Sequence, residues 1–167
     1  MRAVITRVSW ARVSVSGEVV GEIPRGVCAF IGVGREDTEK DALWLADKIC
    51  QCRFFKDEAG KMNRSLLDLA AAGASQPGDE HQCDGQPGPA LLAISQFTLY
   101  GDLRKGHRPS FGAALEPVLA EALFERVCAQ ARALGIRVET GRFGANMQVE
   151  SLNDGPVTLL LDSHKTF

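Results

Sequence analysis

The sequence predicts an α/β domain built on a mixed, mostly antiparallel β-sheet with two main helices on one side. Strand-like segments outnumber helical ones, an uninterrupted apolar run occupies residues 27–33, and only two stretches show helical periodicity. A doubly wound parallel sheet would need a helix after nearly every strand, so this order of elements favours helices that cover one side of the sheet. The length of 167 residues fits one domain, 1–167.

The N-terminal part is expected to form a hairpin followed by a central strand. Val4, Val8 and Trp10 share one parity and Val13 and Val15 the other, and Gly17 and Glu18 form a turn before Val19. The run VCAFIGV at 27–33 is bracketed by glycines and has no polar side. Such a run is typical of a strand that is covered on both faces, which predicts a position at the centre of the sheet.

Two helices are predicted, over residues 38–51 and 117–135. The first begins at Thr38 with Asp41 three residues later, which is an N-terminal capping pattern, and apolar residues then recur at helical spacing. The second begins with Pro117 and ends at Gly135, which are favoured residues at those two positions. Its predicted buried face consists of Leu119, Ala122, Leu123, Val127, Ala131 and Leu134.

The remaining segments are predicted to be four strands and one long loop. The strands are expected at 91–97, 136–142, 147–152 and 157–162. Residues 73–89 are rich in Gly, Pro, Gln and Asp and have no apolar period. We expect these residues to form a flexible surface insertion, with a binding lid as the alternative.

Composition narrows the classes of partner and cofactor. Net charge is −2, so a nucleic-acid partner would have to be held by a local cluster of Lys and Arg. No apolar stretch approaches the roughly 20 residues that span a bilayer, which predicts a cytoplasmic protein with no membrane partner. The five cysteines lack a CxxC pair, and the acidic residues lack metal-ligand spacing. We therefore expect no metal and no other cofactor.

Common hydrolase signatures are missing from the sequence. It contains neither a GxSxG nucleophile elbow nor an HExxH zinc motif. A side-chain nucleophile would also need an adjacent base, usually a histidine. His81 lies in the insertion and His164 in the C-terminal tail, so neither is well placed for that role.

Three segments carry candidate functional residues, and each has a plainer alternative. SQFTLY at 95–100 ends a buried strand with polar groups that could hold a developing oxyanion, or merely satisfy local hydrogen bonds. In NDGPVT at 153–158, the Gly-Pro pair could let the backbone approach a ligand closely, or form a simple turn. DLRKGHRPSF at 102–111 is either a basic phosphate-binding cluster or a solvated loop.

The chain resembles the D-aminoacyl-tRNA deacylase family. The matching segments are, in order, MRAVITRVSWARVSVSGEVVGEI, KMNRSLLD, SQFTLYGDLRKGHRPSF, TGRFGANMQV and NDGPVT. The resemblance covers almost the whole chain, and the combination of SQFTLY with NDGPVT is its most specific part. It implies a barrel-like β/β/α sandwich and a hydrolase that cleaves the ester bond of D-aminoacyl-tRNA in chiral proofreading during translation.

The resemblance also implies a homodimer whose active sites lie at the subunit interface. The catalytic segment of one subunit would consist of Ser95, Gln96, Phe97 and Thr98. The implied substrate-binding residues are Arg7, Phe143, Met147, Asn153, Gly155 and Pro156. The resemblance also implies that the basic cluster binds tRNA through Arg104, Lys105 and Arg108.

The implied mechanism needs no side-chain nucleophile. Gly155 and Pro156, joined by a cis peptide bond and held by Arg7, would enter from the partner and present carbonyls to the substrate amino group. Main-chain atoms there would reject an L side chain sterically, while glycine has no side chain to exclude, so glycyl-tRNA mischarged on tRNA(Ala) is an expected second substrate. Catalysis would use the terminal adenosine 2′-hydroxyl and bound water, while the protein contributes orientation and main-chain donors, namely the N–H groups of Gln96 and Phe97. Thr98 is assigned to substrate positioning.

The chain departs from the family pattern at three places. Its 73–89 loop is long, Trp10 stands where a basic or polar residue is common, and Asn146 replaces a usual Asp. Two other functions remain alternatives: an editing deacylase that acts on L-aminoacyl-tRNA, and a noncatalytic RNA-binding module. The intact SQFTLY motif argues against the first, and the absence of a stacking aromatic motif argues against the second.

Overall fold

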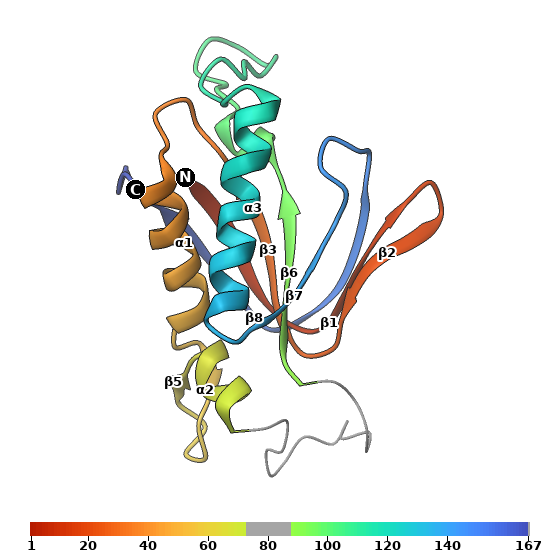
Figure 1. Ribbon diagram of the computed structural model, residues 1–167, viewed down its shortest axis with the longest axis vertical. Helices are drawn as coiled ribbons and strands as arrows, with labels where there is room; N and C mark the ends of the chain where they lie inside the picture. The colour runs from red at the N-terminus through yellow and green to blue at the C-terminus, as the bar shows by residue number, and fades with distance from the viewer. Residues whose placement is uncertain (73–87, 167) are drawn as a thin grey trace.

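The computed structural model describes residues 1–72 and 88–166 (Figure 1). The expected flexible insertion at 73–89 therefore lies outside the described residues except for its last two positions. One sheet of six strands has the order β2-β1-β3-β6-β7, with β8 paired to β1. The strands of this sheet are β1 (Arg2–Val15), β2 (Glu18–Ile23), β3 (Gly26–Gly32), β6 (Ala90–Ser95), β7 (Arg137–Thr140) and β8 (Gln148–Asp162).

The predicted N-terminal hairpin is confirmed. Strands β1 and β2 are antiparallel and are joined by Ser16 and Gly17, which have φ of 52° and 84°. Two positive φ angles are typical of the tight hairpin turn whose twist matches its strands. The chain then passes from β2 into β3, which pairs with the first half of β1. Together β2 and β3 line one side of β1 over nearly its whole length.

The predicted central strand is confirmed as β3. It pairs antiparallel with β1 on one side and parallel with β6 on the other, and β7 continues the parallel part. The sheet also curls back on itself. A Cβ built on Gly21 of β2 would lie 2.6 Å from the carbonyl oxygen of Thr140 in β7, although these strands are at opposite ends of the strand order. The barrel-like mixed sheet implied by the resemblance is therefore confirmed.

The two main helices lie side by side on one face of the sheet (Figure 1). They are α1 (Glu39–Gln51) and α3 (Pro117–Ala133), as predicted. Alternate residues of the strands separate two cores, because successive side chains point to opposite faces. Val27 and Ala29 pack towards the helices, whereas Cys28 lies in a second cluster inside the curled sheet. No helix in the described ranges is long and apolar enough to cross a membrane.

The predicted buried face of α3 is wrong in its N-terminal half. The buried residues are Ala120, Phe124, Val127, Cys128 and Ala131. Leu119 is 56% exposed and Ala122 is also exposed. The helix has apolar residues on two adjoining stripes, and periodicity alone does not select between them. The observed stripe follows i, i+4, i+7, i+8 and i+11, which keeps closer to one side of the helix.

Three short elements between α1 and residue 72 were not predicted. They are the two-stranded hairpin of β4 (Phe55–Lys56) and β5 (Met62–Arg64), and helix α2 (Leu66–Ala71). Helix α2 begins with a capping box in which Ser65 accepts from the Asp68 N–H and Asp68 accepts from the Ser65 N–H. This Ser-x-x-Asp pattern is visible in the sequence, and it was the available signal for the helix.

The C-terminal part forms one strand where two were predicted. Strand β8 runs antiparallel to β1 for 15 residues. Its pairing skips between Asn153, opposite Val8, and Thr158, opposite Thr6. The intervening residues bulge from the ladder opposite Arg7, and the strand then resumes in the same direction. A bulge of this kind adds residues to one strand without reversing it, so the Gly-Pro pair does not end β8.

Candidate active site

A cavity of about 560 Å³ opens where β6 ends. Strand β6 leads into the short 3-10 helix η1 (Phe97–Tyr100). Ser95, Gln96 and Phe97 line the cavity together with Phe143 and Met147. The structure therefore brings together five of the predicted site residues. Other apolar lining comes from Ile31, Ala120 and Phe124, which the sequence patterns placed only in a core strand or a helix, and from Leu115, which they did not single out.

The main chain of SQFT offers fewer free donors than the sequence suggested. The Gln96 N–H donates to the carbonyl of Ile31 at 2.8 Å, which extends the β3–β6 ladder by one bond. That N–H is consequently not available to a ligand. Phe97 is the first residue of η1, and its amide precedes any acceptor within the 3-10 turn. Of the two expected main-chain donors, Phe97 is the one that this geometry leaves for substrate.

The Thr98 hydroxyl is oriented by a neighbouring side chain. It accepts a hydrogen bond from the Gln96 Nε2 group. A side-chain amide donates protons and has no basic nitrogen, so this contact fixes the hydroxyl without activating it as a nucleophile. Thr98 itself is not part of the cavity lining, in contrast to the three residues before it.

Aromatic side chains form the walls of the cavity. The exposed Phe97 ring meets Phe111 edge to face, with 5.0 Å between centroids and an angle of 72°. Phe143 packs against Phe124 of α3 at 6.1 Å. The Met147 side chain passes over Gly141, where a Cβ would overlap its sulfur. Such walls suit a flat, partly apolar ligand with a few polar groups near Ser95 and Gln96.

The Gly155–Pro156 turn lies elsewhere in the same chain. Its peptide bond is cis, as the resemblance implied, and both residues are exposed. The turn bulges opposite Arg7 of β1, whereas the Gln96 N–H bonds to Ile31, which pairs with Ala3. Ala3 and Arg7 are four residues apart along β1, which corresponds to roughly 13 Å at about 3.3 Å per residue. The turn is absent from the lining of its own chain's cavity, and so is the exposed Asn153.

Arg7 ties this turn to the body of the protein. Its side chain is only 3% exposed. Nη1 donates to the Phe54 carbonyl at 2.6 Å, and Nε reaches the Asp154 carboxylate at 2.9 Å and the Asp154 carbonyl at 3.3 Å. Gly155 has a φ of +122°, and a Cβ there would lie 3.1 Å from Arg7 Nη2 and 2.8 Å from Val157 Cγ2. The guanidinium therefore packs directly against the glycine.

The basic segment is exposed, but its charges are not equivalent. Arg104 forms an ion pair with Asp102 at 2.6 Å and adds a second contact through Nε. Hydrogen bonds from Arg104 hold the pKa of Asp102 well below its usual range. The side chains of Lys105 and Arg108 are exposed. Arg104 thus stabilises the loop, while the other two present positive charge to solvent.

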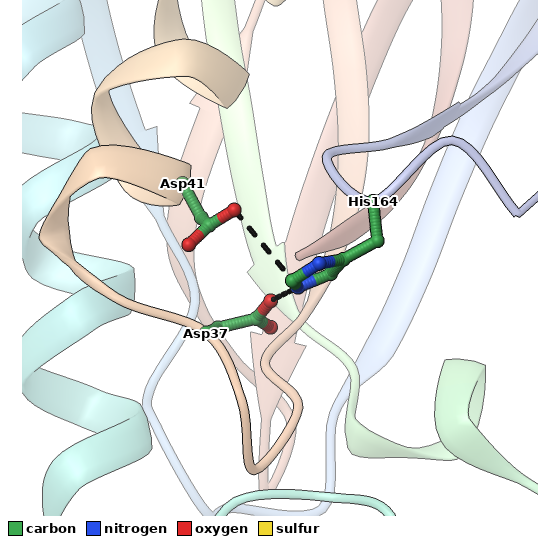
Figure 2. Close-up of side chains that lie close together, drawn as sticks. All are labelled: Asp37, Asp41 and His164. Atoms are coloured by element: carbon green, nitrogen blue, oxygen red, sulfur yellow. Dashed lines mark hydrogen bonds and ion pairs between the residues drawn. The ribbon is translucent and has the colours of Figure 1, made fainter.

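One group of side chains in the described ranges has the donor atoms of a metal site. The possible ligand atoms of Asp37, Asp41 and His164 lie within 4.8 Å of one another (Figure 2). The Met1 ammonium group donates to Asp37 Oδ1, and His164 Nε2 lies 2.8 Å from the same oxygen. These contacts supply positive charge and hydrogen bonds to the buried carboxylate from within the chain, so the group needs no metal ion to be satisfied.

Comparison with known proteins assigns the chain to a family. A family model described as D-Tyr-tRNA(Tyr) deacylase matches residues 4–162. The chain belongs to this family. The deacylase relatives include a D-aminoacyl-tRNA deacylase of Symbiobacterium thermophilum, 51% identical over 100% of this chain and 99% of the relative. Another, from Thermus aquaticus, is 52% identical over 98% of this chain and 95% of the relative.

Solved structures agree with the deacylase fold. A structure described as the c-Myc DNA unwinding element binding protein has a TM-score of 0.80 and 36% identity, and covers 97% of this chain and 98% of its own. A probable eukaryotic D-amino acid tRNA deacylase has a TM-score of 0.73 at 16% identity, which supports the fold alone. That match covers 96% of this chain and 97% of the other.

Proposed function

We propose that the chain hydrolyses the ester bond of D-aminoacyl-tRNA and releases the free D-amino acid and the tRNA. Family membership over residues 4–162 and relatives named D-aminoacyl-tRNA deacylase support this reaction. The observation that carries it is the cavity in which Ser95, Gln96 and Phe97 meet aromatic walls. The activity serves chiral proofreading in translation, and we propose a cytoplasmic location because aminoacyl-tRNA is used there.

In the proposed reaction the protein orients the substrate and does not attack it covalently. The ester carbonyl lies against the Ser95–Thr98 segment, where the Phe97 N–H stabilises the developing negative charge. The Thr98 hydroxyl is fixed by Gln96 and, although it does not line the cavity, is assigned to positioning the substrate. The nucleophile is a bound water, which adds to the ester carbonyl with the help of the terminal adenosine 2′-hydroxyl. The bond to the ribose oxygen then breaks, and that oxygen takes the proton that the water gives up. Orientation in the cavity accounts for the acceleration.

We propose that selection for D-amino acids depends on the turn of a second subunit. Gly155 and Pro156 would face the cavity of the partner, with Asn153 beside them, and their carbonyls would accept hydrogen bonds from the substrate amino group. Rigid main chain at this place leaves no room for an L side chain. Glycine has no side chain, so glycyl-tRNA mischarged on tRNA(Ala) is the proposed second substrate.

The edge of the sheet supports a homodimer. Strand β8 pairs only with β1 among the described strands, which leaves a 15-residue edge open. That edge carries exposed leucines at 152, 159 and 160. A long, apolar, unprotected edge strand is a site of pairing with another chain, and closed symmetry provides an identical edge on a second copy. A dimer through β8 would also bring each turn close to the other subunit.

The direct test is hydrolysis of paired substrates that differ only in chirality. Purified protein without added metal is expected to release tyrosine from D-tyrosyl-tRNA at least about 100-fold faster than from L-tyrosyl-tRNA, because the turn excludes the L side chain. Release of labelled tyrosine is measured at matched enzyme concentrations. Preference for the L-substrate would identify an editing deacylase of opposite chirality. Tight binding without turnover of either substrate would identify an RNA-binding module.

A second test separates the charges of the tRNA-binding segment. Lys105→Ala and Arg108→Ala are each expected to weaken tRNA binding and to lower the slope of log affinity against log salt by about 0.7 to 0.9, the value for one lost phosphate contact. Arg104→Ala is expected to change the slope less, since Asp102 already compensates its charge. Fluorescence anisotropy with labelled tRNA at several salt concentrations measures all three. Identical slopes for wild type and every variant would remove this segment from the tRNA interface.

A further inference from the structure

The catalytic segment lies directly on the main chain of β3 and the residues that follow it. A Cβ at Gly32 would be 2.9 Å from the Gln96 carbonyl oxygen, and a Cβ at Gly34 would be 2.6 Å from the Tyr100 ring. Neither position has room for a side chain while η1 stays in place. The position of η1 therefore depends on the contacts that keep it packed against Gly32 and Gly34.

Tyr100 anchors the buried end of η1. Its hydroxyl donates to Asp37 Oδ2 at 3.0 Å. The Arg2 guanidinium lies over the ring, 4.6 Å from its centroid, and Arg2 Nη1 donates to the Leu99 carbonyl at 3.1 Å. These contacts hold the last two residues of a four-residue turn whose first two are Phe97 and Thr98. A shift of Tyr100 would therefore be transmitted to the cavity.

Asp37 accepts the hydrogen bond by which Tyr100 holds η1 in place. Its side chain is 1% exposed and lies between the end of β3 and the start of α1. Oδ2 accepts from Tyr100 and from the Gly34 N–H at 2.5 Å, while Oδ1 accepts from the Met1 ammonium. Oδ1 also lies 2.8 Å from His164 Nε2, and Figure 2 shows this contact. Both carboxylate oxygens are doubly engaged, so little freedom remains in the position of the group.

We propose that Asp37 is a positioning residue for deacylation, which fixes the Phe97 N–H and the Thr98 hydroxyl through its hydrogen bond to Tyr100. The inference rests on the proposed function. A buried ion pair is often no more stabilising than apolar side chains of the same volume, so stability alone does not account for this carboxylate. A fully satisfied polar network does specify one geometry, and the geometry specified here is that of η1.

The first test compares Asp37→Asn and Tyr100→Phe, which preserve side-chain volume. Each is expected to lower kcat on D-tyrosyl-tRNA about tenfold with KM within about twofold, because displaced groups orient the reacting centre poorly while the cavity still binds. The double variant is expected to be no slower than Asp37→Asn alone, since both changes break the same hydrogen bond. Wild-type kcat in both folded single variants would overturn the inference.

Asp41→Asn is the matched control. Asp41 belongs to the same cluster, but its Oδ2 accepts from the Thr38 N–H at 2.9 Å and from the Thr38 hydroxyl at 2.7 Å rather than from a residue of η1. Loss of this helix cap is expected to lower Tm while kcat stays at the wild-type value. If Asp41→Asn lowers kcat as much as Asp37→Asn, the effect is one of stability and the positioning role is wrong.

A spectroscopic readout separates this inference from the proposed function. Tyr100 is the only tyrosine in the chain, so tyrosine labelled with ¹³C at Cζ gives one resonance. Burial, together with the charge of Asp37, raises the pKa of Tyr100. In Asp37→Asn we expect this resonance to shift, and the ¹⁵N amide signals of Phe97 and Thr98 to shift with it, but not in Asp41→Asn. Unchanged amide signals would overturn the positioning role, whereas an inactive wild type would overturn the proposed function.

Discussion

Leu160→Glu in β8 is expected to yield a folded monomer whose deacylase activity is about 1,000-fold lower, because the orientation supplied by a complete site is lost. Leu160 is 61% exposed in the single chain, so its replacement removes little from the core. At a symmetric interface the new carboxylate appears twice and is buried without a partner, which costs several kcal/mol at each position. Sedimentation is expected to show half the wild-type mass, and circular dichroism an unchanged fold.

Val19→Glu is the control for this result. Val19 is also exposed, at 47%, but it lies in β2, on the other side of β1 from β8. This variant is expected to remain dimeric and active. A monomeric Leu160→Glu protein with wild-type activity would show that each chain carries a complete site. A dimeric and active Leu160→Glu protein would locate the subunit interface away from β8.

Subunit complementation tests the shared site more directly. Gly155→Ala damages only the turn, because the residue has a φ of +122° and its Cβ would meet Val157. Phe97→Pro removes the Phe97 N–H at the first position of η1, where proline fits. Each homodimer is expected to be inactive. A heterodimer of the two variants, purified by two different tags, regains one intact site and about half of the wild-type activity. An inactive heterodimer would contradict a site built from two subunits.

Local sequence patterns predicted most of the framework. The apolar run at 27–33 gave the central strand because both of its faces are covered, and Thr38 with Asp41 marked the start of α1 through a capping box. Ser65 with Asp68 carries the same information for α2, but a helix of six residues is too short to show helical periodicity. An apolar run and a helix cap each depend on only a few neighbouring residues, so they can be recognised in the sequence.

Features that depend on contacts between distant segments were not predictable in this way. The buried face of α3 is selected by packing against α1 and the sheet, and β8 remains one strand because β1 continues to pair with it beyond the bulge. The role of the Gln96 N–H depends on Ile31. Asp37 meets Tyr100 and His164 only in the folded chain, and nothing in the sequence distinguishes it from the adjacent acid Glu36.

Arg7→Lys is expected to lower kcat/KM on D-tyrosyl-tRNA about 100-fold and to reduce the preference for D over L about tenfold, since a small displacement of the turn is enough to misplace the reacting groups. The planar guanidinium reaches the Phe54 carbonyl and Asp154 simultaneously, whereas one ammonium group cannot hold both. A buried hydrogen bond to a charged group contributes about 1.5 to 3 kcal/mol, and unfolding should become easier by a similar amount.

Arg12→Lys separates the effect on the turn from a general effect on the β1–β8 pair. Arg12 lies on the same strand and forms a two-pronged contact with Glu150 of β8 at 2.9 and 2.8 Å, but both side chains are exposed. An exposed pair contributes at most about 1 kcal/mol, so this variant should keep its stability and its selectivity. Loss of stability in Arg7→Lys with an unchanged ratio of D to L hydrolysis would reduce Arg7 to a structural role. A lower ratio of D to L hydrolysis in Arg7→Lys, with an unchanged ratio in Arg12→Lys, would show that selection for the D-substrate depends on the position of Gly155.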